Sequence, residues 1–324
     1  MVFKYLGKTK VSCQKLIKDY LPEYVSRRKK SIFEVASEKH KTDDGEISIT
    51  HVMTNQTEIA SAVLETMSFK LVIDEGFYDY TKAREGEDTW FVNFADPTLF
   101  VAYDSDLFAQ DEIQTLEMPL LASCCLFLDQ RQADHTTKTV TDFGEPTPYL
   151  FGNVPYWISV NTRPIMKDGT TSNIYGDEFM YATEEELATG IKVFEGNVRV
   201  NVLAIAAPRC RSGQRYNTAE LAQIIKTLLC SYSAVRDQAE GKVVIHTGNW
   251  GCGAFGGNKE LMYLAQMYAA SVCGIDELVL HAVDEVILED AGKAFENMDS
   301  KMKIADVIGY LHSRKYEWGE SDGN

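Results

Sequence analysis

A glycine-rich stretch at residues 243–258, VVIHTGNWGCGAFGGN, contains the residue types that bind a phosphate. Three β-branched residues enter it, five glycines follow, and Asn258 stands at the N-cap position of a helical pattern. Glycines let the backbone approach a ligand closely, and free N–H groups at a loop and a helix start bind anions. The stretch therefore predicts a strand, an anion-binding loop and a helix, with a second strand at 278–280.

The loop alone leaves three interpretations open. Gly251, Gly253 and Gly256 fit the G-x-G-x-x-G pattern of a nicotinamide-dependent oxidoreductase. That match is weak, because only about one further strand–helix–strand unit follows, whereas a dinucleotide fold needs more strands. A tight turn without a ligand is the second interpretation, and an anion site is the third. The Trp and Phe among the glycines exceed what a turn needs and favour the anion site.

A second segment, residues 93–112, concentrates acids between an expected strand at 90–94 and an expected helix at 110–128. Its acidic residues are Asp96, Asp104, Asp106, Asp111 and Glu112. Asp111 and Glu112 fall in the first helical turn, where the helix dipole alone would favour carboxylates. Clustered like charges also raise at least one pKa, which provides a general acid or base near neutral pH. Both segments follow strands, so we expect them to meet at the carboxyl ends of a sheet.

Composition narrows the class of protein and its partners. The chain has 324 residues, of which 45% are hydrophobic and 25% charged, as in globular domains. A formal net charge of −16 argues against nucleic acid as a partner. There is no apolar run long enough to span a membrane and no signal-peptide pattern, so we expect no membrane association. Seven cysteines without C-x-x-C pairs indicate a reducing compartment. We therefore expect a cytoplasmic protein, with secretion into a host cytosol left open, and no metal or cofactor.

Alternating strand-like and helix-like runs after residue 90 predict an α/β fold. Helical patterns at 11–39 and 56–68 predict a helical accessory region over 1–70. Pro119 should kink or split the helix at 110–128. Asn217 and Glu220 form a capping box for another helix, and an amphipathic helix is expected near 303–315. His246 and His281 end the two strands around the glycine loop, where packing or hydrogen bonding is a better interpretation than metal binding; His281 could also flank a nucleobase.

Together, the two segments resemble the poly(ADP-ribose) glycohydrolase family of macrodomains. Residues 247–257, TGNWGCGAFGG, are nearly the family's diphosphate-binding loop. Residues 92–96, VNFAD, and 110–112, QDE, resemble the start and end of its catalytic segment, and residues 303–311 resemble its closing helix. The resemblance covers about 90–312, patchily between 130 and 240. It implies a macrodomain-like mixed sheet flanked by helices over 71–316, preceded by the helical extension and followed by a disordered tail at 317–324.

The resemblance also implies site residues, and the chain departs from the family at some of them. Three family glycines fall on Phe100, Val101 and Ala102, and the tandem glutamates become Asp111 and Glu112, with Glu112 at the catalytic position. The candidate catalytic residues are Asp104, Asp106, Asp111 and Glu112. The candidate substrate-binding residues are Asp96, Gln110, Thr247, Gly248, Asn249, Trp250, Gly251, Cys252, Gly253, Ala254, Phe255 and Gly256.

The resemblance implies ADP-ribose as ligand and a hydrolase acting on ADP-ribosylated protein. The acidic loop favours a cationic leaving group, so arginine-linked mono-ADP-ribose is the main hypothesis. A non-catalytic ADP-ribose reader, suggested by the missing glycines, and a poly(ADP-ribose) glycohydrolase are the alternatives.

Overall fold

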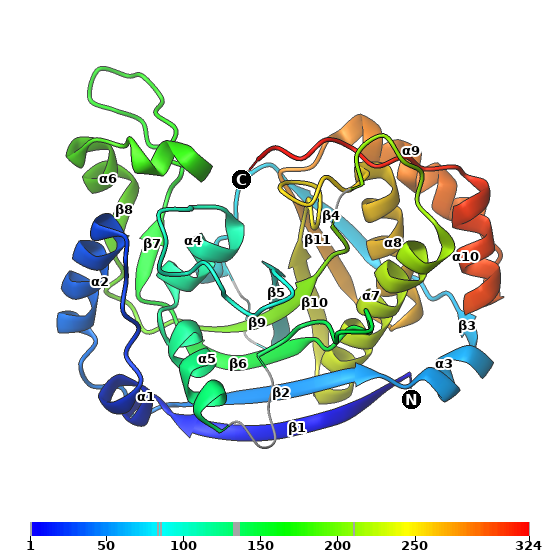
Figure 1. Cartoon of the computed structure of the whole chain (residues 1–324), viewed down its shortest axis with the longest axis horizontal. Helices are drawn as coiled ribbons and strands as arrows, with labels where there is room; N and C mark the ends of the chain where they lie inside the picture. The colour runs from blue at the N-terminus through cyan, green and yellow to red at the C-terminus, as the bar shows by residue number, and fades with distance from the viewer. Residues whose placement is uncertain (1, 83, 85, 132–136, 210, 324) are drawn as a thin grey trace.

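A mixed sheet of eight strands organises the computed structural model, which describes residues 2–82, 84, 86–131, 137–209 and 211–323 (Figure 1). The strand order is β1-β2-β6-β9-β5-β10-β11-β4. The strands span Phe3–Ser12 (β1), Glu46–Thr54 (β2), Lys70–Asp74 (β4), Glu87–Ala95 (β5), Tyr149–Pro155 (β6), Arg199–Ala206 (β9), Lys242–Thr247 (β10) and Glu277–His281 (β11). Two small ribbons pair β3 (Val63–Glu65) with β12 (Lys301–Lys303) and β7 (Ile158–Val160) with β8 (Ile191–Val193).

The sheet has a parallel half and an antiparallel half. β9, β5, β10, β11 and β4 run parallel to one another, whereas β1, β2, β6 and β9 pair antiparallel. Parallel strands need crossovers, and helices supply them. The carboxyl ends of the five parallel strands therefore lie at one edge of the sheet, where ligands bind in such folds.

Helices cover both faces of the sheet, and each face has its own hydrophobic core. One core includes α3 (Gln56–Ser61), α7 (Thr218–Gln238), α8 (Lys259–Val272), α9 (Glu285–Glu296) and α10 (Ile304–Ser313). The other includes α1 (Cys13–Asp19), α2 (Arg27–Lys39), α4 (Gln110–Glu117) and α5 (Leu120–Gln130). Figure 1 shows these two groups on opposite sides of the molecule. A short helix, α6 (Glu184–Gly190), lies beside α2.

The layered mixed sheet and most of the expected elements are confirmed. β5 covers the strand expected at 90–94, and the strand, loop, helix and strand around the glycines are β10, α8 and β11. The helix expected at 110–128 is divided into α4 and α5 beside Pro119. Asn217 and Glu220 form the predicted capping box of α7. Within the described residues, no helix has the length and apolar character needed to cross a bilayer.

The N-terminal region differs from the expected helical extension. Residues 3–12 and 46–54 form β1 and β2, which extend the central sheet through β6. Side chains of β1 alternate between half-buried and exposed positions, as in an edge strand. The helical expectation at 11–39 holds only for α1 and α2. Residues 1–70 therefore include part of the same sheet rather than a separate helical layer.

Candidate functional site

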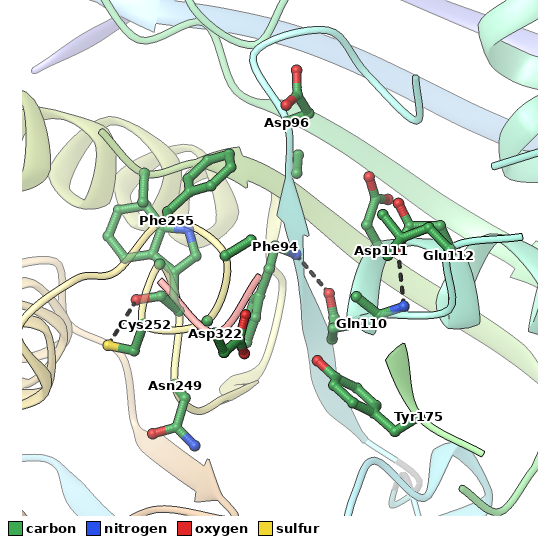
Figure 2. A pocket seen from close by; sticks show the side chains of 18 of the residues that line it. Phe94, Asp96, Gln110, Asp111, Glu112, Tyr175, Asn249, Cys252, Phe255 and Asp322 are labelled. Carbon is green, nitrogen blue, oxygen red and sulfur yellow. Dashed lines mark hydrogen bonds between the residues drawn. The ribbon is translucent and has the colours of Figure 1, made fainter. Parts of the chain in front are cut away.

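A cavity of about 510 Å³ lies where the parallel strands end. Residues directly after four of these strands line it: Asp96 after β5, Ala207 after β9, Asn249 after β10 and Ala282 after β11. The glycine loop forms one wall and the N-terminal turn of α4 forms another. Figure 2 shows Asp111 and Glu112 on one side, with Cys252 and Phe255 on the other. The two segments singled out in the sequence therefore meet in one cavity.

The glycine loop is shaped by close approaches that a side chain would prevent. The amide of Gly257 donates to the carbonyl of Gly251 over 2.7 Å, and that of Gly256 donates to Gly253 over 2.8 Å. A Cβ on Gly257 would lie 2.6 Å from the Gly251 oxygen. Gly251 has a φ of +73°, in the left-handed region that favours glycine. These bonds leave the stretch from Gly253 through Phe255 along the cavity.

Buried side chains beneath the glycine loop hold it in position. Trp250 is fully buried, and its Nε1 donates to the Ile205 carbonyl over 3.0 Å. Thr247 donates through Oγ1 to Gln266, which in turn donates to the Gly248 carbonyl. Trp250 and Thr247, both expected to bind substrate, are therefore mainly supports of the loop. The Trp250 residue also contributes to the cavity lining, and Thr247 and Gly248 line a smaller cavity beside it.

The acidic wall is held against β5 by side-chain hydrogen bonds. Gln110 accepts from the Phe94 amide at 2.7 Å and donates to the Val92 carbonyl at 3.1 Å, so its amide pairs with the strand backbone. Asp111 accepts a hydrogen bond of 2.9 Å from the buried Asn93 amide. Glu112 accepts from the Ala109 amide at 3.2 Å, which caps the start of α4. The first turn of α4 therefore holds two neighbouring carboxyl groups at the cavity.

Burial of these two carboxyl groups raises both of their pKa values. For Asp111 the pKa lies well above its ordinary value, because the group is desolvated and Glu112 is close. Desolvation also raises the pKa of Glu112, while the Lys29 ammonium and the Ala109 amide oppose that rise. Burial therefore favours the protonated form of both groups, and the Lys29 ammonium opposes this at each of them. Different environments for two adjacent acids are typical of acid–base sites.

The structure brings most of the expected site residues together. The larger cavity is lined by Asp96, Gln110, Asp111, Glu112, Asn249, Trp250, Gly251, Cys252, Gly253, Ala254 and Phe255. Asp104, Asp106 and Gly256 are not among its lining residues. Asp104 and Asp106 instead act on Lys29 of α2, as their charges raise its pKa. Asp104 and Asp106 are absent from the cavity lining because residues 100–108 turn back onto α2. The candidate catalytic residues therefore narrow to Asp111 and Glu112.

Asp96 lines the cavity but is engaged by a cation. Its Oδ2 accepts a 2.6 Å hydrogen bond from Arg209, whose guanidinium also lies over the Phe255 ring. The other carboxylate oxygen accepts the Thr98 amide. Asp96 therefore contributes less free negative charge than its position in the sequence implies.

A smaller cavity of about 140 Å³ opens beside the first, and several aromatic side chains line it; we call it the aromatic cavity. Phe77 and Tyr175 line both cavities, and their rings are nearly parallel, 17° apart, with centroids separated by 6.5 Å. Thr162 also lines this cavity, and its buried hydroxyl has no hydrogen-bond partner among the described residues. Sequence reasoning missed these residues, because they come from turn-rich segments without a periodic pattern.

Glu117 lies at the inner end of the aromatic cavity as a buried acid. Its carboxyl group accepts hydrogen bonds from the Tyr80 hydroxyl at 3.0 Å and the Val160 amide at 3.2 Å. Burial raises the pKa of Glu117 to about 8, against the effect of both donors. The group is therefore mainly neutral at pH 7.

The two histidines form a hydrogen-bonded pair, as expected for strand ends. Nδ1 of His281 lies 3.0 Å from the Gly76 carbonyl, so it must donate, which leaves Nε2 as an acceptor. Nδ1 of His246 then donates to that nitrogen over 2.8 Å. Burial lowers the pKa of His246 to about 4. His281 also lines the aromatic cavity.

The C-terminal segment expected to be disordered reaches the glycine loop. The Trp318 amide donates to the Gln214 carbonyl, and the Ser321 hydroxyl donates to the Ala254 carbonyl at 2.7 Å. Asp322 lines the cavity and appears there in Figure 2. Its carboxylate lies 3.1 Å from the place a Cβ on Gly253 would take. An anion bound at Gly253 would therefore meet this carboxylate.

The raised pKa of Glu117 predicts a pH-dependent effect on stability. An acid whose pKa is raised by folding stabilises the native state only while it stays protonated, so its contribution declines as pH rises from about 4.5 to about 8. Glu117→Gln removes the ionisation at nearly constant volume. We expect the variant to gain stability relative to the parent between pH 5 and pH 8, measured by denaturant unfolding at both values. An unchanged difference would show that folding does not raise the pKa of Glu117.

Comparisons with known proteins find similarity to poly(ADP-ribose) glycohydrolases. Residues 168–289 match the family model described as poly(ADP-ribose) glycohydrolase (PARG), macro domain fold. An Arabidopsis thaliana protein named probable poly(ADP-ribose) glycohydrolase 2 is 26% identical over 200 residues, which are 56% of this chain and 37% of that protein. The chain thus spans little more than a third of the length of this curated relative.

Solved structures from two bacteria are similar to this chain over most of its length. The poly(ADP-ribose) glycohydrolase of Thermomonospora curvata is 15% identical with a TM-score of 0.45, and covers 90% of this chain and 85% of its own. The Deinococcus radiodurans enzyme in complex with ADP-ribose is 13% identical with a TM-score of 0.42, and covers 89% and 94%. The family match over residues 168–289, together with the relative, shows that this chain is similar to the poly(ADP-ribose) glycohydrolase family over part of its length.

Proposed function

We propose that this protein is a glycohydrolase that releases ADP-ribose by cleaving the bond at the anomeric carbon of its distal ribose. The observation that supports this most is the single cavity in which the glycine loop faces Asp111 and Glu112. A diphosphate would bind the backbone of Gly253 through Phe255. The attached ribose would then extend toward the two carboxyl groups.

The aromatic cavity suits the other end of the same ligand. Flat faces of Phe77 and Tyr175 suit stacking of a nucleobase, which contributes ~1–3 kcal/mol per base. The Glu117 carboxyl and the free Thr162 hydroxyl can form hydrogen bonds to a base edge. Both cavities share Phe77, Tyr175 and Asn249, so one extended nucleotide can occupy both. This supports an order of adenine, diphosphate and distal ribose across the site.

The two carboxyl groups can divide the chemistry of glycosidic cleavage. Breaking the bond develops positive charge on the ribose, and an ionised carboxylate nearby stabilises that charge and activates water. Glu112 is the better candidate for this role, because it lines the cavity at the position that matches the catalytic glutamate of the family that the chain resembles. Burial raises the pKa of Asp111 well above its ordinary value, and the Asn93 side chain holds this group in place. Asp111 can protonate the leaving group where geometry allows, or keep the site from carrying two charges.

Poly(ADP-ribose) is the substrate that the relatives favour. The Arabidopsis protein and the two bacterial enzymes are named for this activity. Asp104 and Asp106 do not line the cavity, so their charges give less support to a guanidinium leaving group. We therefore place hydrolysis of the polymer ahead of arginine-linked mono-ADP-ribose.

Arginine-linked mono-ADP-ribose remains the second candidate. The cavity wall carries side chains where the family has glycines, and several acids line the cavity. Val101 and Ala102 line the cavity at positions where the family has glycines, which narrows the space for a polymer chain. Asp111, Glu112 and Asp322 also line it, and carboxylates pair well with a guanidinium.

One assay separates these candidates. The protein is incubated with poly(ADP-ribose) and with arginine-, serine- and glutamate-linked mono-ADP-ribosyl proteins, and released ADP-ribose is quantified. Fastest release from polymer supports the main proposal, and fastest release from the arginine linkage supports the second candidate. Binding of ADP-ribose without release from any substrate would contradict both and leave a reader module.

Substitutions at two glycines test the diphosphate assignment. Gly253→Val should weaken ADP-ribose binding at least tenfold, because the side chain enters the cavity and its nearest neighbour is the Asp322 carboxylate. Gly257→Ala should instead lower stability, because its Cβ meets a backbone oxygen. Calorimetry with ADP-ribose and thermal unfolding of both variants provide the readouts. Unchanged affinity in a folded Gly253→Val protein would refute the assignment.

Glu112→Gln tests the carboxylate role. We expect a loss of turnover of about 10²-fold or more, with ADP-ribose affinity within a few-fold of the parent, because the charge is removed at nearly constant volume. Glu289→Gln, an exposed change on α9, serves as the matched control and should leave turnover unaltered. Near-parental turnover of Glu112→Gln would move the catalytic role to Asp111.

A further inference from the structure

Lys29 is a buried cation from the N-terminal region that reaches the catalytic segment. It lies on α2, and none of its surface is exposed. Its ammonium group donates to the carbonyl oxygens of Leu107, at 2.6 Å, and Tyr103, at 3.1 Å. Both carbonyls belong to the loop between β5 and α4, only a few residues before Glu112. Buried lysines are rare, so one placed here calls for a functional reason.

Several further contacts fasten this loop to α2. The Ser26 amide donates to the Asp104 carbonyl at 2.8 Å. The Tyr24 ring packs edge-on against Tyr103, with centroids 5.7 Å apart. In addition to the Lys29 ammonium, the loop therefore has a backbone contact with the N-cap of α2 and an aromatic contact with the segment just before it.

The loop itself lacks the glycines expected in this family and still adopts a glycine-like bend. Phe100, at the first of those positions, has a φ of +53°, which is unfavourable for a residue with a side chain. Its ring is buried against Phe151. A loop with this strained backbone needs external contacts to hold one conformation, and α2 supplies them.

The charges that act most strongly on Lys29 are negative. The carboxylates that favour its charged form are Glu112, Asp104, Asp106 and Asp111, with Glu112 the strongest. Burial opposes that form, and the balance lowers the pKa of Lys29 to about 8, so it remains mainly charged at pH 7. Around Glu112, Asp96 acts in the opposite sense to Lys29, because its charge raises the Glu112 pKa.

We propose that Lys29 is a positioning residue of the active site, which fastens the loop before α4 and holds a positive charge near Glu112. This inference rests on the proposed function for its catalytic meaning, but the physical coupling of Lys29 to Glu112 can be tested without turnover. It assigns a functional role to the region before β5, which the sequence presented as an accessory segment. The N-terminal helix α2 is then part of the catalytic apparatus, although Lys29 is not among the residues that line the cavity.

Three variants separate charge from shape. Lys29→Met keeps a long side chain without charge, and Lys29→Arg keeps the charge with a different head group. Lys30→Met, an exposed change at the next position of the same helix, is the matched control. Because replacing a buried charge with an apolar side chain is often neutral for stability, we expect Lys29→Met to remain folded.

The first readout is the titration of Glu112, followed by carboxyl ¹³C NMR and assigned with Glu112→Gln. In Lys29→Met the Glu112 titration should move to higher pH by about one pH unit, because a nearby cation is lost. Lys29→Arg should stay close to the parent, and Lys30→Met should match it. An unmoved titration in folded Lys29→Met overturns the proposal, whether or not the protein turns over any substrate.

The second readout is the pH dependence of ADP-ribose release from the substrate that the parent cleaves fastest. Lys29→Met should lose at least tenfold in kcat at pH 7, recover part of that loss at higher pH, and keep its KM within about threefold. A loss of kcat that is equal at every pH overturns the role of the Lys29 charge at Glu112. If Lys29→Met fails to fold, Lys29→Arg decides: parental Glu112 titration and activity support the proposal, and a folded Lys29→Arg with a displaced titration refutes it. A parent without turnover refutes the proposed function alone.

Discussion

The neighbouring carboxyl groups of Asp111 and Glu112, buried at the start of α4, are the constraint on which this site depends. Carboxylates are costly to bury unless they are hydrogen-bonded or lie near a positive charge, and both conditions are met here. Asn93 donates to Asp111, the helix amide of Ala109 donates to Glu112, and Lys29 lies nearby with a positive charge. The position of α4 follows from this arrangement, because the Gln110 amide pairs with the backbone of β5 and fixes the helix start at the strand end.

The sheet then determines what the carboxyl groups face. Because β5 and β10 are adjacent parallel strands, the loops that follow them emerge at the same edge. The acidic turn and the glycine loop are more than a hundred residues apart in the chain, and this pairing alone makes them neighbours. Trp250 fixes the loop from below by donating to β9, the strand on the other side of β5. Catalytic geometry in this protein is therefore a consequence of strand order.

Local sequence patterns predicted the elements near the site and failed for what depends on long-range contacts. The glycines, the Asn258 cap and the β-branched run identified β10 and α8, because turn and cap chemistry act over a few residues. β1 and β2 were missed, since β2 pairs with β6 about a hundred residues later in the chain, and β1 joins the sheet only through β2. Asp104 and Asp106 were expected to be catalytic from local charge density. Their orientation depends on α2, which no local pattern links to this loop.

The residues that sequence reasoning missed are those whose roles require a partner. Lys29 belongs to a run of four basic residues that reads as a solvated helix face, yet it is the fully buried member of that run. Phe77 and Tyr175 are unremarkable as single aromatics until the fold makes their rings parallel. Glu117 is one acid among many in the sequence, but in the fold it is buried and accepts hydrogen bonds from Tyr80 and Val160. In each case the sequence supplies a residue type, whereas the fold supplies the environment that changes its chemistry.

Because the net charge of the chain is −16, the proposed diphosphate would have to bind without a general positive potential. The backbone of the glycine loop meets this need, because peptide N–H groups attract an anion through fixed local dipoles that act at short range. Arg163 and Lys259 are the basic residues that line the larger cavity, alongside four carboxyl groups at Asp96, Asp111, Glu112 and Asp322. Asp322 adds a further requirement, since its carboxylate lies beside Gly253 and two anions cannot share that place at low cost. A diphosphate at Gly253 would therefore lie against a carboxylate of the C-terminal segment, which also contacts Ala254 through the Ser321 hydroxyl.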